Sequence, residues 1–115
     1  MTGSDNLDKF IAEMKSGKSD LSHVRTALRL EFNHHETTSS QIRSMAKKTE
    51  GVVKDLWEPY EEKSFAREMV SDKDKWDEDY FDSQVVYLKT NFSRKRFDHL
   101  LAVKDKLHTD GVKGF

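Results

Sequence analysis

The stretch that decides the fold is residues 76–107, WDEDYFDSQVVYLKTNFSRKRFDHLLAVKDKL. Its centre, 85–88, has the β-branched and aromatic content of a strand. The apolar residues around that centre nevertheless follow the spacing of one helical face: Phe81, Val85, Leu88 and Phe92. The spacing favours a helix. Ser93 is placed to cap a second helix, whose apolar residues are Phe97, Leu100, Leu101, Ala102 and Leu107.

Helical spacing also extends upstream of this stretch. Ser4 or Asp5 can cap a first helix that ends at Gly17, with its apolar face at Leu7, Phe10, Ile11 and Met14. A second helix opens at Ser19 or Asp20 and ends near 33–35, with its face at Leu21, Val24, Leu28 and Phe32. A third, capped by Thr38 or Ser39, is expected to bend at Gly51 and to end near Glu58, before Pro59.

These patterns predict an all-α protein, a bundle of four or five helices in a single domain, with loose ends at 1–4 and 111–115. A short helical piece is expected at 64–70, followed by a capping turn at 71–74. The predicted core consists of Leu28, Phe32, Ile42, Met45, Leu56, Trp57, Phe65, Phe81, Val85, Leu88, Phe97, Leu100 and Leu101.

The composition narrows the class of protein. The 115 residues fit one domain, and charged residues (36%) match hydrophobic ones (35%), which suggests a thin core or a surface shared with a partner. Cysteine is absent, as a reducing compartment permits, and we expect a cytoplasmic location. The first residues do not resemble a signal peptide, and no apolar run is long enough to span a bilayer, so no membrane partner is expected.

Charge is distributed unevenly along the chain. Residues 55–82 carry eleven Asp and Glu against four Lys and Arg, whereas residues 89–113 carry three against seven. Such adjoining segments of opposite sign are typical of a protein that binds another macromolecule.

Catalytic and metal-binding patterns are weak. The acids at 72–79 lack the Gly and Glu that an EF-hand loop needs at its sixth and twelfth positions. His34 and His35, even with Glu31, supply fewer ligands than a zinc site requires. No glycine-rich phosphate loop or nucleophile motif is visible. We therefore predict no metal, no cofactor and no enzymatic activity, although carboxylate pairs among Glu58, Glu61, Glu62 and Asp79 are compatible with acid–base chemistry.

The leading hypothesis is a protein-binding module of the adaptor, chaperone or inhibitor kind. Its partner would be a basic protein that docks on an acidic and aromatic helical face formed by Glu61, Trp76, Asp77, Glu78, Asp79, Tyr80 and Asp82. The competing interpretation is structural: Trp76, Tyr80 and Phe81 belong to the core, and the acids only solvate the outer face.

Two other functions are compatible with the sequence. A nucleic-acid-associated regulator would contact phosphates through Arg94, Lys95 and Arg96, although the chain as a whole carries a net charge of −1. A structural subunit would form a homodimer or larger assembly through an exposed apolar stripe from Ile42 to Tyr60.

Overall fold

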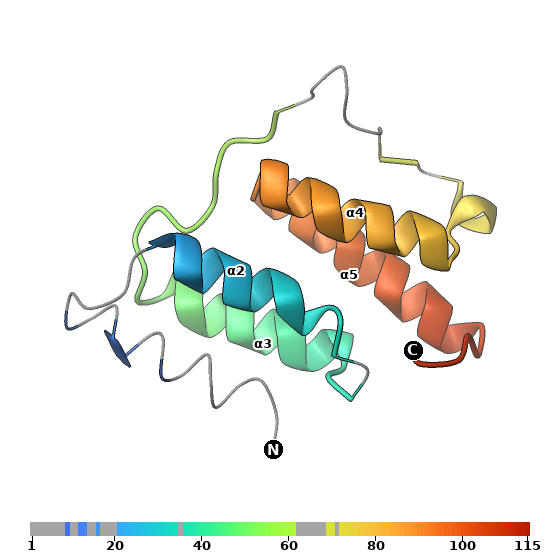
Figure 1. The fold of residues 1–115 in the computed structure, drawn as a ribbon, viewed down its shortest axis with the longest axis horizontal. Helices are drawn as coiled ribbons and strands as arrows, with labels where there is room; N and C mark the ends of the chain where they lie inside the picture. The colour runs from blue at the N-terminus through green and yellow to red at the C-terminus, as the bar shows by residue number, and fades with distance from the viewer. Residues whose placement is uncertain are drawn as a thin grey trace. The chain divides into compact units, whose positions relative to one another are not determined.

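The computed structural model describes residues 9, 12–13, 16, 21–34, 36–61, 69–70 and 72–115. Within these residues the chain forms four α-helices and one short 3₁₀ helix, η1, and no strand (Figure 1). The all-α class is therefore confirmed. The predicted tail 1–4, the whole apolar face of the predicted first helix, and most of the predicted helical piece at 64–70, with its core residue Phe65, lie outside the described residues.

The chain consists of two compact units, Met1–Leu56 and Trp57–Phe115. The prediction of a single domain stays a prediction.

The first unit contains the helices α2 (Leu21–Glu31) and α3 (Ser39–Glu50), which pack side by side as a hairpin (Figure 1). Thr38 caps α3 as predicted: its side chain accepts from the Gln41 amide at 3.2 Å, and the Gln41 side chain accepts from the Thr38 amide at 2.8 Å. This reciprocal capping box satisfies two amides that a helix start otherwise leaves unpaired. The predicted apolar faces of both helices are buried, at Val24, Leu28, Ile42, Met45 and Ala46.

The prediction that the third helix continues to Glu58 is wrong, because α3 ends at Glu50 with Gly51 as its C-cap. Glycine destabilises a helix interior by about 1 kcal/mol relative to alanine, and Asp55 then adopts a left-handed conformation with φ 61°. The Arg25 side chain donates to the carbonyls of Asp55 and Leu56, each at 2.7 Å. Those two carbonyls are held by α2 instead of by a continued helix.

The second unit contains η1 (Lys73–Lys75), α4 (Glu78–Thr90) and α5 (Arg94–Thr109). α4 and α5 form a hairpin whose turn is three residues long, and Ser93 caps α5 as predicted, accepting from the Arg96 amide. Val85 and Leu88 lie within α4, so the helix is confirmed over the strand. The hairpin buries the predicted core residues Phe81, Val85, Leu88, Phe97, Leu100 and Leu101.

Residues 57–61 run beside the α4–α5 turn. Glu58 donates its amide to the Phe92 carbonyl at 2.8 Å and accepts the Phe92 amide on Oε1 at 2.9 Å. The buried Asn91 side chain accepts from the Glu61 amide and donates to the Pro59 carbonyl. Trp57, half-buried where a core position is predicted, stacks on Phe92 with ring centroids 5.3 Å apart. Side-chain hydrogen bonds thus fix a segment that has no regular structure of its own.

The last residues, for which the sequence predicts a loose end, fold back on this hairpin. The Val112 amide donates to the Leu107 carbonyl at 3.0 Å, and the Phe115 ring packs edge-on against Phe81 at 4.9 Å. Gly111 makes the required reversal in a positive-φ conformation (75°), which favours glycine.

Candidate functional site

The start of α4 is where the structure gathers acidic side chains in the second unit. η1 ends at Lys75 with Trp76 as its C-cap, and Asp77 then caps α4, its Oδ1 accepting from the Tyr80 amide at 2.8 Å. Glu78 and Asp79 occupy the first turn of the helix, and both are exposed. Negative charge at a helix N-terminus is favoured by the helix dipole, so this position stabilises the carboxylates locally.

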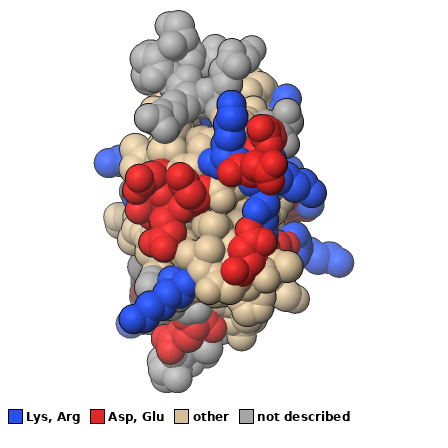
Figure 2. All heavy atoms as spheres, turned by 90° about the vertical axis from the view of Figure 1, so that its right-hand side faces the viewer, with Lys and Arg blue, Asp and Glu red and all other residues tan. Residues whose placement is uncertain are grey.

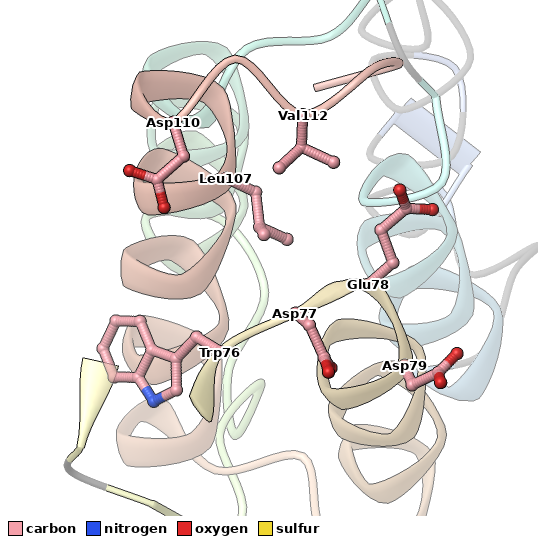
Figure 3. A pocket seen from close by; sticks show the side chains of 7 residues that line it. All are labelled: Trp76, Asp77, Glu78, Asp79, Leu107, Asp110 and Val112. Atoms are coloured by element: carbon pink, nitrogen blue, oxygen red, sulfur yellow. The ribbon is translucent and has the colours of Figure 1, made fainter. Parts of the chain in front are cut away.

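These carboxylates line an open hollow of about 420 Å³ (Figure 3). Its lining comes from the start of α4, the end of α5 and the segment after it: Trp76, Asp77, Glu78, Asp79, Leu107, Asp110 and Val112. In Figure 3 the apolar side chains of Leu107 and Val112 lie between Asp110 on one side and Glu78 on the other. The hollow therefore combines an apolar middle with a carboxylate rim.

The rim carboxylates differ in how they are paired. Asp110 forms an ion pair with Lys106, one turn earlier on α5, and Asp77 uses one oxygen for capping. Glu78 and Asp79 have no cationic partner among the described residues, and the same holds for Asp82 one turn further along α4. Figure 2, which faces the end of the hairpin where α4 begins, shows several groups of carboxylates with basic groups between them. The hollow thus has carboxylates available to a cation from outside.

The arrangement suits a lysine or arginine side chain. Such a side chain buries its aliphatic stem on apolar surface while its charged head stays near polar groups. In the hollow, Leu107 and Val112 offer the apolar surface for the stem, and Glu78 and Asp79 offer carboxylates for the charged head.

The two aromatic residues predicted for the binding face are buried. Trp76 is 7% exposed and Tyr80 is 5% exposed, and Phe81 is buried with them. This agrees with the structural interpretation, in which these rings belong to the core. Trp76 still forms one wall of the hollow, so it shapes the acidic site from within instead of presenting a free ring.

A chain of hydrogen bonds holds these rings in place. The Trp76 indole donates to the Val70 carbonyl at 2.7 Å, and the Val70 amide donates to the Tyr80 hydroxyl at 2.8 Å. That hydroxyl lies 2.7 Å from His99 Nε2. Burial raises the pKa of the Tyr80 hydroxyl, and burial together with the Arg96 charge lowers the pKa of His99.

The outer face of α4 carries an apolar residue that the sequence prediction missed. Val86 is 59% exposed, the most exposed large apolar side chain of the described residues, and Tyr87 beside it is half-buried. Val86 lies one helical turn after Asp82, on the side away from the buried face. The exposure of Val86 could have been predicted from the sequence, because Val86 does not follow the spacing of the buried face formed by Phe81, Val85 and Leu88.

Glu61 does not join the acids at the start of α4. Its amide donates to the Asn91 side chain at 3.1 Å, and its carbonyl accepts from Arg96 at 3.1 Å. Both contacts place it at the α4–α5 turn, and α4 is 13 residues long, about 20 Å at 1.5 Å per residue. The structure therefore brings together Asp77, Glu78 and Asp79, with Asp82 one turn on, but not Glu61.

The basic triplet at the start of α5 is largely engaged within the chain. Arg96 is 5% exposed and reaches the Glu61 carbonyl, while its Nε and Nη1 have no hydrogen-bond partner. Lys95 lies over the Tyr60 ring, 4.3 Å from its centroid. Arg94 lies near the Trp57 ring and 3.6 Å from the exposed Asp98 carboxylate. Of the three, Arg94 and Lys95 are exposed and could contact the phosphates of a nucleic acid, whereas Arg96 is buried.

The apolar stripe required for self-assembly is not exposed. Of its members, Ile42, Met45, Ala46, Val53 and Leu56 are buried, and Trp57 and Tyr60 are half-buried. The expectation of an exposed Ile42–Tyr60 stripe is therefore wrong, since the chain covers most of it itself.

Within the described ranges, no three His, Asp or Glu side chains are grouped in a way that could hold a metal ion. In the same ranges, every helix is too short or too polar to cross a bilayer. No family model matches the chain, and no curated protein or solved structure shows significant similarity to it.

Proposed function

We propose that the protein is a non-enzymatic binding module that docks a basic protein partner on the acidic end of α4. The role would be that of an adaptor, a chaperone or an inhibitor acting in the cytoplasm. The observation that carries this proposal is the hollow of about 420 Å³, in which carboxylates surround an apolar middle.

Charge supports a basic partner. Glu78, Asp79 and Asp82 are exposed on consecutive turns of one helix and lack cationic partners among the described residues. Carboxylates arranged in this way attract a positive surface and raise its rate of association, while they disfavour acidic partners.

Shape and apolar surface favour a protein over a free cation. Beyond Asp82, the outer face of α4 continues to the exposed Val86 and the half-buried Tyr87. A partner that places a basic side chain in the hollow can also cover Val86. Interfaces gain most of their affinity from such desolvated apolar contacts and use the charged rim for specificity and rate.

The experiment is capture from a lysate of the source cells at low and high salt, followed by identification of bound protein and nucleic acid. The test variant is Asp79→Lys/Asp82→Lys. The matched control is Glu36→Lys/Asp98→Lys, which makes the same change in net charge at exposed positions that do not line the hollow. Neither test position caps a helix, whereas Asp77 does.

The proposal expects one basic protein to be captured by the wild type and by the control, and to be lost from the test variant. High salt should weaken its capture, because ions screen exposed charges beyond about 10 Å at 0.1 M. Equal capture by the test variant and the wild type would contradict the proposal. Salt-sensitive recovery of nucleic acid that survives the test variant would favour the role of Arg94 and Lys95 instead.

A further inference from the structure

The outer face of α4 carries a row of four exposed side chains, which we call the outer row: Asp79, Asp82, Val86 and Lys89. They follow one another at intervals of three, four and three residues, which places them along one side of the helix. This is the spacing by which one helix contacts another along its length. At the middle of the row, Val86 is 59% exposed.

The charge changes sign along the outer row. Asp79 and Asp82 precede Val86 on the helix, and Lys89 follows it, in the last turn of α4. Neither Asp82 nor Lys89 has an ion-pair partner among the described residues. The row therefore offers an acid on one side of an exposed apolar side chain and a base on the other side.

A row of this kind is complementary to a second copy of itself. Asp82 lies four residues before Val86 and Lys89 three residues after it, which is about 6 Å and about 4.5 Å along the helix axis. When two α4 helices lie antiparallel with their Val86 side chains facing each other, Lys89 of each copy lies within about 1.5 Å of the level of Asp82 in the other copy. A parallel pair would instead oppose acid to acid and base to base, which is unfavourable.

We infer that the outer row of α4 is an interface between two copies of this chain, which pack antiparallel about a twofold axis at Val86. In such a symmetric dimer the same surface serves on both sides, so the contact between Asp82 and Lys89 forms twice. The two Val86 side chains cover each other, which removes exposed apolar surface from water.

The length of α4 sets the strength of this dimer. The helix has 13 residues, about 20 Å, and Val86 is the one large apolar residue in the outer row. Stable interfaces bury about 1,200–2,000 Å² in total, and smaller ones belong to weak, transient complexes. We therefore expect a dimer that forms at high protein concentration and exchanges with the monomer. Because it covers Asp82 and Val86, it competes with the basic partner, and this consequence alone rests on the proposed function.

The first experiment is disulfide trapping, which the cysteine-free sequence makes specific. Val86→Cys places one thiol of the full chain on the twofold axis, and Asp98→Cys, at an exposed position on α5, is the matched control. A disulfide requires Cα atoms within about 7 Å of each other. Under a mild oxidant, Val86→Cys should give a covalent dimer on a non-reducing gel, whereas Asp98→Cys should stay largely monomeric.

The second experiment exchanges charges and is followed by sedimentation equilibrium. The average mass of the wild type should rise with concentration from 13.4 kDa towards twice that value. Asp82→Lys and Lys89→Glu, each alone, oppose like charges at both ends of the interface and should weaken association at least about tenfold. The combined variant Asp82→Lys/Lys89→Glu has the net charge of the wild type and again opposes unlike charges, so it should restore the dimer.

Three results would each overturn the interface. They are a mass that stays at 13.4 kDa at every concentration, a combined variant that associates no better than the single variants, and equal trapping from positions 86 and 98. Neither experiment uses the basic partner, so failure of the dimer and failure of the proposed function are distinguishable.

Discussion

Asp77 has two possible roles, and one substitution series separates them. It lines the acidic hollow, and its Oδ1 also accepts from the Tyr80 amide at 2.8 Å as the N-cap of α4. Replacing Asp77 by Ala removes both the acceptor and the charge. Replacing it by Asn removes the charge but keeps a side-chain oxygen that can accept the same hydrogen bond.

The size of each effect follows from these contacts. Loss of an N-cap acceptor costs about 1 kcal/mol, within a range of about 0.5–2 kcal/mol. Loss of a negative charge at a helix start costs about 0.3–1 kcal/mol more. We therefore expect Asp77→Ala to lose about 1.5 kcal/mol of unfolding free energy, and Asp77→Asn only about 0.5 kcal/mol. A difference of 1 kcal/mol in a domain of this size corresponds to a melting temperature lower by about 4–8 °C.

The assay is urea and thermal unfolding followed by far-UV circular dichroism, with Asp79→Ala as the matched control. Asp79 is exposed in the same helical turn and accepts no capping bond, so its removal should cost only the charge contribution. Equal losses for Asp77→Ala and Asp77→Asn would refute the capping role. This result matters for binding as well, because a charge reversal at Asp77 would disturb the helix along with the surface.

Three further outcomes are expected. Thr38→Ala should destabilise the first unit by about 1 kcal/mol, because Thr38 provides the capping box of α3; urea unfolding tests this, and an unchanged midpoint contradicts it. Arg96→Met should change the free energy of unfolding by less than about 1 kcal/mol, because a buried cation with two nitrogens that lack a hydrogen-bond partner gains little over an apolar side chain. A loss of unfolding free energy above about 3 kcal/mol would contradict this expectation. The same variant should raise the pKa of His99 in an NMR titration, because the Arg96 charge lowers it. Finally, the free energy of unfolding should fall as the pH drops below about 6.5, because the lowered pKa of His99 makes the unfolded chain bind the proton more readily. His99→Gln should reduce this dependence of stability on pH, and an unchanged dependence in the variant would contradict the prediction.

Much of the fold is readable in local signals. Thr38 and Ser93 cap helices where the sequence predicts them, and the spacing of Phe81, Val85 and Leu88 correctly outweighs their β propensity. These features depend on residues within a turn or two of each other, so a single sequence contains the whole cause.

The errors come from contacts between distant residues. The segment after Gly51 has helical spacing, but Arg25 binds its carbonyls from 30 and 31 positions away. Trp76 and Tyr80 sit beside exposed acids in sequence, yet Val70 and His99 draw them into the interior. Such partners become adjacent only after folding, and local spacing contains no trace of them.

The same reason limits the prediction of the site. The acids at the start of α4 are visible in the sequence, whereas Leu107, Asp110 and Val112 complete the hollow from about thirty residues further along the chain. The binding role of the basic triplet looked plausible because its three charges are adjacent. Only the fold shows that Arg96 is directed inward, towards Glu61.

The most direct test of the central claim is site-specific photo-crosslinking in the source cells. A photoreactive residue replaces Val86, which is 59% exposed on the outer face of α4. The account predicts a crosslink from position 86 to one basic protein, which is lost when Asp79→Lys/Asp82→Lys is added. A crosslink from position 86 that survives the charge reversal would contradict it.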